Sequence, residues 1–82
     1  MLVQVSLSGS IKSVAGGRDT VELEAETIRQ LLQALEQEVP ALAGQIEQGV
    51  AVSIDGQIFR DAWFQRIPRD AEVFVLPRLA GG

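Results

Sequence analysis

Apolar and polar residues alternate in two segments near the start of the chain, residues 3–8 and 20–26. A period of two is typical of a strand that buries one face, so both segments are expected to be strands. In the second segment the valine, leucine and alanine would face the core, and the glutamates between them would face solvent. Residues 9–19 are mostly small and contain Gly16-Gly17, which predicts a loop and hence an antiparallel hairpin.

The clearest helix follows, because residues 27–39 repeat their apolar positions at the spacing of an amphipathic helix. Thr27, with Gln30 three residues later, forms a capping-box pattern in which side chains satisfy free N–H groups of the first turn. Pro40 cannot continue a helix, so the helix is expected to end near Val39. The apolar stripe would consist of Ile28, Leu31, Leu32 and Leu35.

Three further strands are expected in the second half of the chain. Residues 50–55 form a short strand, and Asp55-Gly56 is a tight-turn signal that leads into another strand at residues 57–59. Residues 60–71 are interpreted as an irregular connection. The last strand covers residues 72–76, with Val73 and Val75 on one face and Phe74 and Leu76 on the other.

The resulting order is β-β-α-β-β-β, in which residues 41–49 form a looser stretch anchored by Leu42 and Ile46. A chain with so few strands can bury one face of its sheet under a single long helix. The predicted fold class is therefore α+β, with a mixed sheet of four to five strands packed on one main helix.

Composition narrows the classes of function. The 82 residues fit one domain, and eleven acidic residues against seven basic ones give a net charge of −4, which argues against nucleic acid as a partner. The chain has no cysteine and no histidine, so it lacks a thiolate nucleophile, the commonest general base and the commonest zinc ligand. No apolar run approaches the ~20 residues of a membrane span, and the expected location is the cytoplasm.

The chain closes on "VFVLPRLAGG", in which a strand runs into Pro77 and the last two residues are Gly81 and Gly82. Residues 1–76 are expected to form the domain and residues 77–82 a flexible tail. Such a tail reaches at most roughly 20 Å when extended, enough to enter a buried site in a partner. Glycine has no Cβ, so the tip could pass through a narrow channel and leave the terminal carbonyl open to attack.

These features together resemble a ubiquitin-like β-grasp protein and, more narrowly, the MoaD/ThiS family of sulfur carriers. That family includes the small subunit of molybdopterin synthase and the thiazole sulfur carrier. The resemblance covers essentially the whole chain and is strongest in "VAVSIDG", "IKSVAGG" and "RDAEVFVLPRLAGG". Three positions depart from the family pattern: Asp55 replaces an asparagine, Arg78 replaces the second of two prolines, and Asp70-Ala71 replaces Gly-Asp. The molybdopterin branch is slightly favoured over the thiazole branch.

The resemblance implies a carrier that is not itself an enzyme. An E1-like adenylyltransferase would activate Gly82 with ATP, and a sulfur donor would then convert the carboxylate into a thiocarboxylate. Gly81 would share that site, and the carrier itself would bind no cofactor and no metal. The acceptor would be a synthase, similar either to the large subunit of molybdopterin synthase or to thiazole synthase, in a pathway of cofactor biosynthesis.

A partner surface is also implied. Leu7, Ile58 and Leu76 match family positions at which the sheet docks its partners, and an ordinary role in the core is equally consistent with alternation. Phe74 would join this surface because it shares a face with Leu76. The tail would contribute its remaining residues, Pro77, Arg78, Leu79 and Ala80. Trp63 and Phe64 are expected to pack inside the protein rather than to recognise a partner.

Two other functions fit the same sequence. A ubiquitin-like modifier would join Gly82 to lysines of target proteins, and its only internal acceptor would be Lys12, the single lysine of the chain. A β-grasp interaction module would bind partners through its sheet and have an inert tail. The sequence itself names neither the acceptor nor the pathway.

Overall fold

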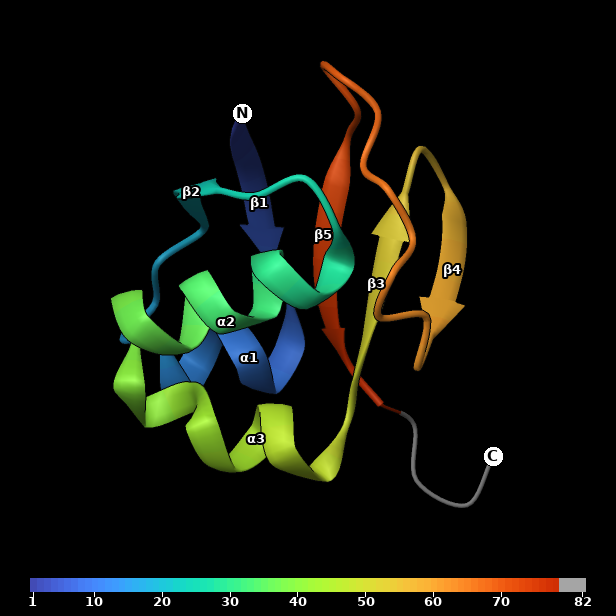
Figure 1. The fold of residues 1–82 in the computed structure, drawn as a ribbon. Helices are drawn as coiled ribbons and strands as arrows, with labels where there is room; N and C mark the ends of the chain where they lie inside the picture. Colours follow the sequence, from blue (N-terminus) through green and yellow to red (C-terminus); the bar gives the residue numbers. More distant parts are fainter. Residues whose placement is uncertain (79–82) are drawn as a thin grey trace.

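Five strands form one mixed sheet in the order β2-β1-β5-β3-β4 (Figure 1). The structure is a computed structural model that describes residues 1–78. β1 and β5 are parallel, and the other three neighbouring pairs are antiparallel. The elements are β1 Leu2–Leu7, α1 Gly9–Val14, β2 Thr20–Glu24, α2 Ile28–Glu38, the 3₁₀ helix η1 Pro40–Leu42, α3 Ala43–Gln48, β3 Val50–Ile54, β4 Gln57–Arg60 and β5 Val73–Pro77.

One face of the sheet is covered and the other is open. Apolar side chains from β1, β2, β3 and β5 point toward the helices, which lie grouped together in Figure 1. The predicted stripe of α2 is buried against them, together with Leu42 of η1 and Ile11 of α1. Burial of apolar surface at about 25 cal/mol per Å² makes this layer the main source of stability. The α+β class and the packing on a main helix are thus confirmed.

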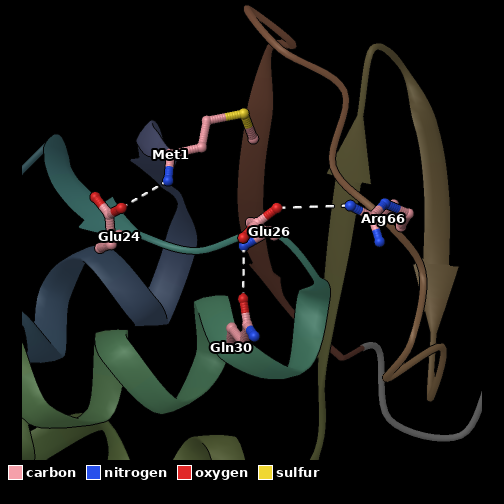
Figure 2. A network of polar contacts seen from close by, with 5 residues as sticks. All are labelled: Met1, Glu24, Glu26, Gln30 and Arg66. Atoms are coloured by element: carbon pink, nitrogen blue, oxygen red, sulfur yellow. Dashed lines mark hydrogen bonds and ion pairs between the residues drawn. The ribbon is translucent and has the colours of Figure 1, made fainter.

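The start of α2 is held by side chains, as the capping-box pattern predicts. Thr27 Oγ1 accepts a hydrogen bond from the Gln30 N–H at 3.3 Å. In return, Gln30 Oε1 accepts from the Glu26 N–H at 2.8 Å, one residue earlier than in the usual capping box (Figure 2). The Glu26 carboxylate also lies 3.5 Å from the Arg66 guanidinium, on the loop between β4 and β5.

Backbone carbonyls of that same loop satisfy the next free N–H groups of α2. The Ile28 N–H donates to the Gln65 carbonyl at 3.0 Å, and the Arg29 N–H donates to the Trp63 carbonyl at 2.8 Å. The first N–H groups of a helix have no partner inside the helix, so a loop in this position completes the helix end. The irregular connection is therefore fixed against α2, although it has no regular structure of its own.

Two predicted boundaries differ from the structure. The expected loop at residues 9–19 contains the short helix α1, which buries Ile11 completely. The looser stretch at 41–49 consists of η1 and α3, with Leu42 fully buried and Ile46 half-buried against the core. α2 ends at Glu38, as Pro40 predicts. Within residues 1–78 no helix has the length and apolar character needed to cross a membrane.

We expect Thr27→Ala to lower the free energy of unfolding by about 1 kcal/mol, because the Gln30 N–H loses its acceptor. Urea denaturation followed by circular dichroism measures this change. Gln33→Ala is the control, since Gln33 is exposed on α2 and leaves the cap intact. Equal stability of Thr27→Ala and the wild type would show that the cap does not hold the helix.

Candidate functional site

The open face of the sheet centres on β5. Val73 and Val75 are buried under the helices, whereas Phe74 and Leu76 are half-buried on the opposite face. The predicted division of this strand into two faces is confirmed. β5 has strand neighbours on both sides, so its two open-face side chains lie in the middle of the sheet and not at an edge.

Strand register places neighbours beside each of these side chains. Phe74 is paired with Ser53 of β3, and Ser53 is paired with Ile58 of β4. One step along the strands, Leu76 is paired with Ala51. Paired residues on one face stand close enough for their side chains to touch.

The result is one continuous surface, which we name the apolar sheet patch. Ala51 and Ser53 are only 4% and 9% exposed, because their small side chains lie between larger neighbours. Ile58 is 55% exposed and forms the prominent edge of the surface. The patch consists of Ala51, Ser53, Ile58, Phe74 and Leu76.

Leu7 is not part of this patch, and the expectation that it contributes to a partner surface is wrong. Its side chain is 5% exposed and packs in the core. The reason is register: Ser6, not Leu7, is paired with Phe74 across β1 and β5. Leu7 is paired with Val75 and so lies on the helix-covered face.

Sequence reasoning missed Ala51, Ser53 and the neighbouring Arg60, which is paired with Ala51. A signal was present, because in "VAVSI" small residues alternate with large β-branched ones. That pattern indicates a strand buried on both sides, with little room on one of them. Which larger side chains cover the small ones depends on the pairing of β3 with β4 and β5.

Pro77 and Arg78 form the described base of the tail. Pro77 is half-buried and is paired with Val50 at the end of β5, one residue beyond the predicted end of the domain. Arg78 is exposed, and its Nη2 lies 3.7 Å from Asp61 Oδ2. The remaining predicted tail residues, Leu79, Ala80, Gly81 and Gly82, lie outside the described residues, so their roles and the 77–82 tail stay predictions.

Trp63 and Phe64 are 43% and 76% exposed, so the expectation that they pack inside the protein is wrong. Two carbonyls of the loop are hydrogen-bonded to the start of α2, as described above, and both rings stay exposed on the surface. They line a shallow groove with Leu32 of α2 and Ile46 of α3. Among residues 1–78 no group of three or more histidine, cysteine, aspartate or glutamate side chains could hold a metal ion.

The arrangement of the described strands and helices matches that of several solved structures. SAMP1 from Haloferax volcanii has a TM-score of 0.77 at 24% identity, with 100% of each chain covered. SAMP1 from Methanosarcina acetivorans, the small archaeal modifier protein 1, has a TM-score of 0.73 at 20% identity, covering 99% of this chain and 96% of that one. The BexX/CysO complex from Amycolatopsis orientalis contains a chain with a TM-score of 0.71 at 19% identity, covering 96% and 98%.

These likenesses define a ubiquitin-like β-grasp fold and confirm that part of the prediction. The model of the ThiS family matches residues 5–82, which is nearly the whole chain. The protein therefore belongs to the ThiS family, and the predicted resemblance to the MoaD/ThiS type is confirmed. A comparison with curated protein sequences gave no significant match.

We expect Leu7→Ala to lower the free energy of unfolding by about 2–5 kcal/mol, because it leaves a cavity in the core. Leu76→Ala, the matched change on the half-buried open face, should cost about 1 kcal/mol or less. Urea denaturation of both variants measures the difference. Equal losses would contradict the assignment of the two leucines to opposite faces.

Proposed function

We propose that this protein is a sulfur carrier whose reacting group is the carboxylate of Gly82. The observation that carries the proposal is the ThiS family match, which runs through the Gly-Gly segment to residue 82. β5 supports it, because this strand ends at Pro77, directly before the segment that would react. In this proposal the chain is a cosubstrate or small subunit and not itself an enzyme.

The proposed chemistry has two steps and takes place on partners. A carboxylate is a poor electrophile, so an E1-like adenylyltransferase first joins Gly82 to AMP and releases pyrophosphate from ATP. A sulfide equivalent from a donor then attacks the acyl carbon, the bond between that carbon and the AMP oxygen breaks, and AMP leaves, which gives a thiocarboxylate. The first step consumes ATP and both steps need partner enzymes, so the proposed location is the cytoplasm. Glycine at the tip leaves the acyl carbon unhindered, since no Cβ shields it.

The apolar sheet patch would dock the activating enzyme or the acceptor. Its exposed edge, Ile58, and its half-buried centre, Phe74 and Leu76, offer apolar surface next to the base of the tail. Apolar positions gathered into one contiguous patch favour a protein partner. The acceptor in this proposal is a synthase, and the last strand, with its "FVLP" motif, slightly favours the molybdopterin type over the thiazole type.

A second candidate, a ubiquitin-like modifier, is favoured by one observation. Two of the similar structures are named as SAMP1, the small archaeal modifier protein 1. In this alternative the adenylated Gly82 would form an amide bond with a target lysine instead of accepting sulfur. Adducts of high mass that depend on Gly82, seen on immunoblots, would favour the modifier over the sulfur carrier.

Incubation with an E1-like enzyme, ATP and a sulfur donor is expected to raise the intact mass by the difference between sulfur and oxygen. Intact-protein mass spectrometry measures this change. Deletion of Gly82 should abolish it, because the shortened chain ends on a different carboxylate. Gly44→Ala, a change in α3 with nothing within 4 Å of the added Cβ, is the control and should leave the mass shift intact. A mass shift that survived the deletion would show that Gly82 is not the sulfur site.

We expect Ile58→Gln to weaken binding to the activating enzyme by about tenfold, the effect of losing ~1.4 kcal/mol of contact energy from the most exposed side chain of the patch. Leu2→Gln is the matched control, because Leu2 is 68% exposed on the same sheet face but lies on β1, away from the patch. Titration calorimetry measures both affinities. If the two variants bound equally well, the apolar sheet patch would not be the docking surface.

A further inference from the structure

The tail leaves the sheet between two glycines with positive φ angles. Gly9, the first residue of α1, has φ +58, and a Cβ there would lie 3.2 Å from Cγ of Pro77. Gly49, between α3 and β3, has φ +113, and a Cβ there would lie 3.0 Å from Nη1 and 3.2 Å from Cδ of Arg78. A larger residue at Gly49 would therefore crowd the arginine side chain, which would have to shift by a few tenths of an ångström, and would also strain the backbone.

A third segment reaches the same point from the other side. Asp61 directly follows β4 and has φ +54, a conformation that aspartate adopts more readily than most residues. Its carboxylate is the ion-pair partner of Arg78, with side-chain exposures of 57% and 45%. Arg78 thus has Gly49 beneath its stem and Asp61 beside its guanidinium.

We propose that Gly9, Gly49 and Asp61 form a cradle for Pro77 and Arg78 that fixes the direction in which the tail leaves the protein. Arg78 stands where the family pattern has the second of two prolines, a residue that would stiffen the chain through its ring. In this chain the contacts of the arginine replace that stiffness. The inference rests on the proposed function, since it concerns the delivery of Gly82 to an activating enzyme.

The physical benefit is a smaller loss of conformational entropy on binding. A tail whose first residues are already ordered has fewer backbone and side-chain angles to fix when it enters a partner's channel. The cradle should therefore lower the KM for this protein as a substrate of the activating enzyme. It should not change kcat, because the reacting carboxylate belongs to Gly82, four residues along the chain from Arg78.

Arg78 could instead act through its charge, by contacting an acidic groove or a phosphate of ATP in the partner. Four variants separate the two roles. Asp61→Asn keeps the charge of Arg78 but removes its neighbour, and Arg78→Ala removes both charge and contact. Arg78→Pro removes the charge but restores stiffness, and it suits the extended conformation that Pro77 already has in β5. The double variant Asp61→Asn/Arg78→Ala tests whether the two residues act together.

The first measurement uses the protein alone. Nitrogen-15 relaxation of the Arg78 backbone and Nε–H groups should show lower order in Asp61→Asn and in Gly49→Ala than in the wild type. Gly56→Ala is the matched glycine control, because Gly56 also has a positive φ of +86 but has nothing within 4 Å of an added Cβ. Asp61→Asn replaces an exposed side chain and should fold. If the order of Arg78 were unchanged in this variant, the proposed cradle would be rejected.

The second measurement is ATP–pyrophosphate exchange by the activating enzyme at varied carrier concentration. Asp61→Asn and Arg78→Ala should each raise KM by about two- to fivefold, the scale of an exposed ion pair, with kcat unchanged. The KM of the double variant should rise no more than that of either single variant. Arg78→Pro should have a KM close to that of the wild type. The inference would be overturned if Asp61→Asn had the KM of the wild type, or if Arg78→Pro raised KM as much as Arg78→Ala does.

The two measurements fail independently. If the wild-type protein supports no exchange, the proposed function is wrong, while the relaxation data still report whether the cradle orders Arg78. If exchange occurs but KM rises only in the variants that remove the charge of Arg78, the sulfur-carrier proposal stands and the cradle is rejected.

Discussion

The structure depends on β5, which must pair with strands on both sides and still lead out of the sheet. Its pairing with β1 and β3 fixes it in the centre, and Val73 and Val75 bind it to the helix layer. The Val75 carbonyl accepts a hydrogen bond from the Ser8 N–H at 3.3 Å, just after β1 has ended at Leu7. The backbone polar groups of alternate strand residues point to the same side, so Pro77 faces the same side as Val75, where β1 has already ended. The missing N–H of Pro77 therefore costs no hydrogen bond to a neighbouring strand.

This position of β5 joins the stable part of the protein to its proposed reacting group. The same strand supplies the apolar sheet patch through Phe74 and Leu76 and the base of the tail through Pro77. A partner that docks on the patch would therefore contact a surface rigidly connected to the exit of the tail. The connecting loop adds to this rigidity, since its carbonyls complete the start of α2 and its Asp61 meets Arg78.

Local signals predicted those elements that have a strong period or a clear boundary. The main helix could be placed from three such signals: the apolar stripe of α2, the Thr27 cap, and Pro40, which cannot continue a helix. The helix α1 was missed because its six residues include one buried apolar side chain, Ile11, among small and polar residues. So short a segment has little helix propensity of its own, and tertiary packing decides its conformation.

The candidate site was only partly predictable, because β5 is apolar on both faces and alternation does not tell which of them is covered. Alternation in the first strand groups Leu7 with the buried Val3 and Val5, and the register with Val75 agrees; it was the family resemblance that placed Leu7 on the partner surface. Exposure of Trp63 and Phe64 was not predictable either, because the position of their loop depends on hydrogen bonds to α2 between segments more than 30 residues apart in the chain. The contacts of Arg78 with Gly49 and Asp61 likewise form only when β3, β4 and β5 have paired, so no local pattern predicts them.

The central claim is that the terminal carboxylate, and no side chain, is the group that becomes activated. Hydroxylamine intercepts an acyl adenylate and leaves a stable hydroxamate at the activated carbon. Reaction of the protein with an E1-like enzyme, ATP and hydroxylamine, followed by fragmentation mass spectrometry, would locate that mark. We predict a single hydroxamate on Gly82; a mark on an aspartate or glutamate side chain, or no ATP-dependent mark at all, would contradict the claim.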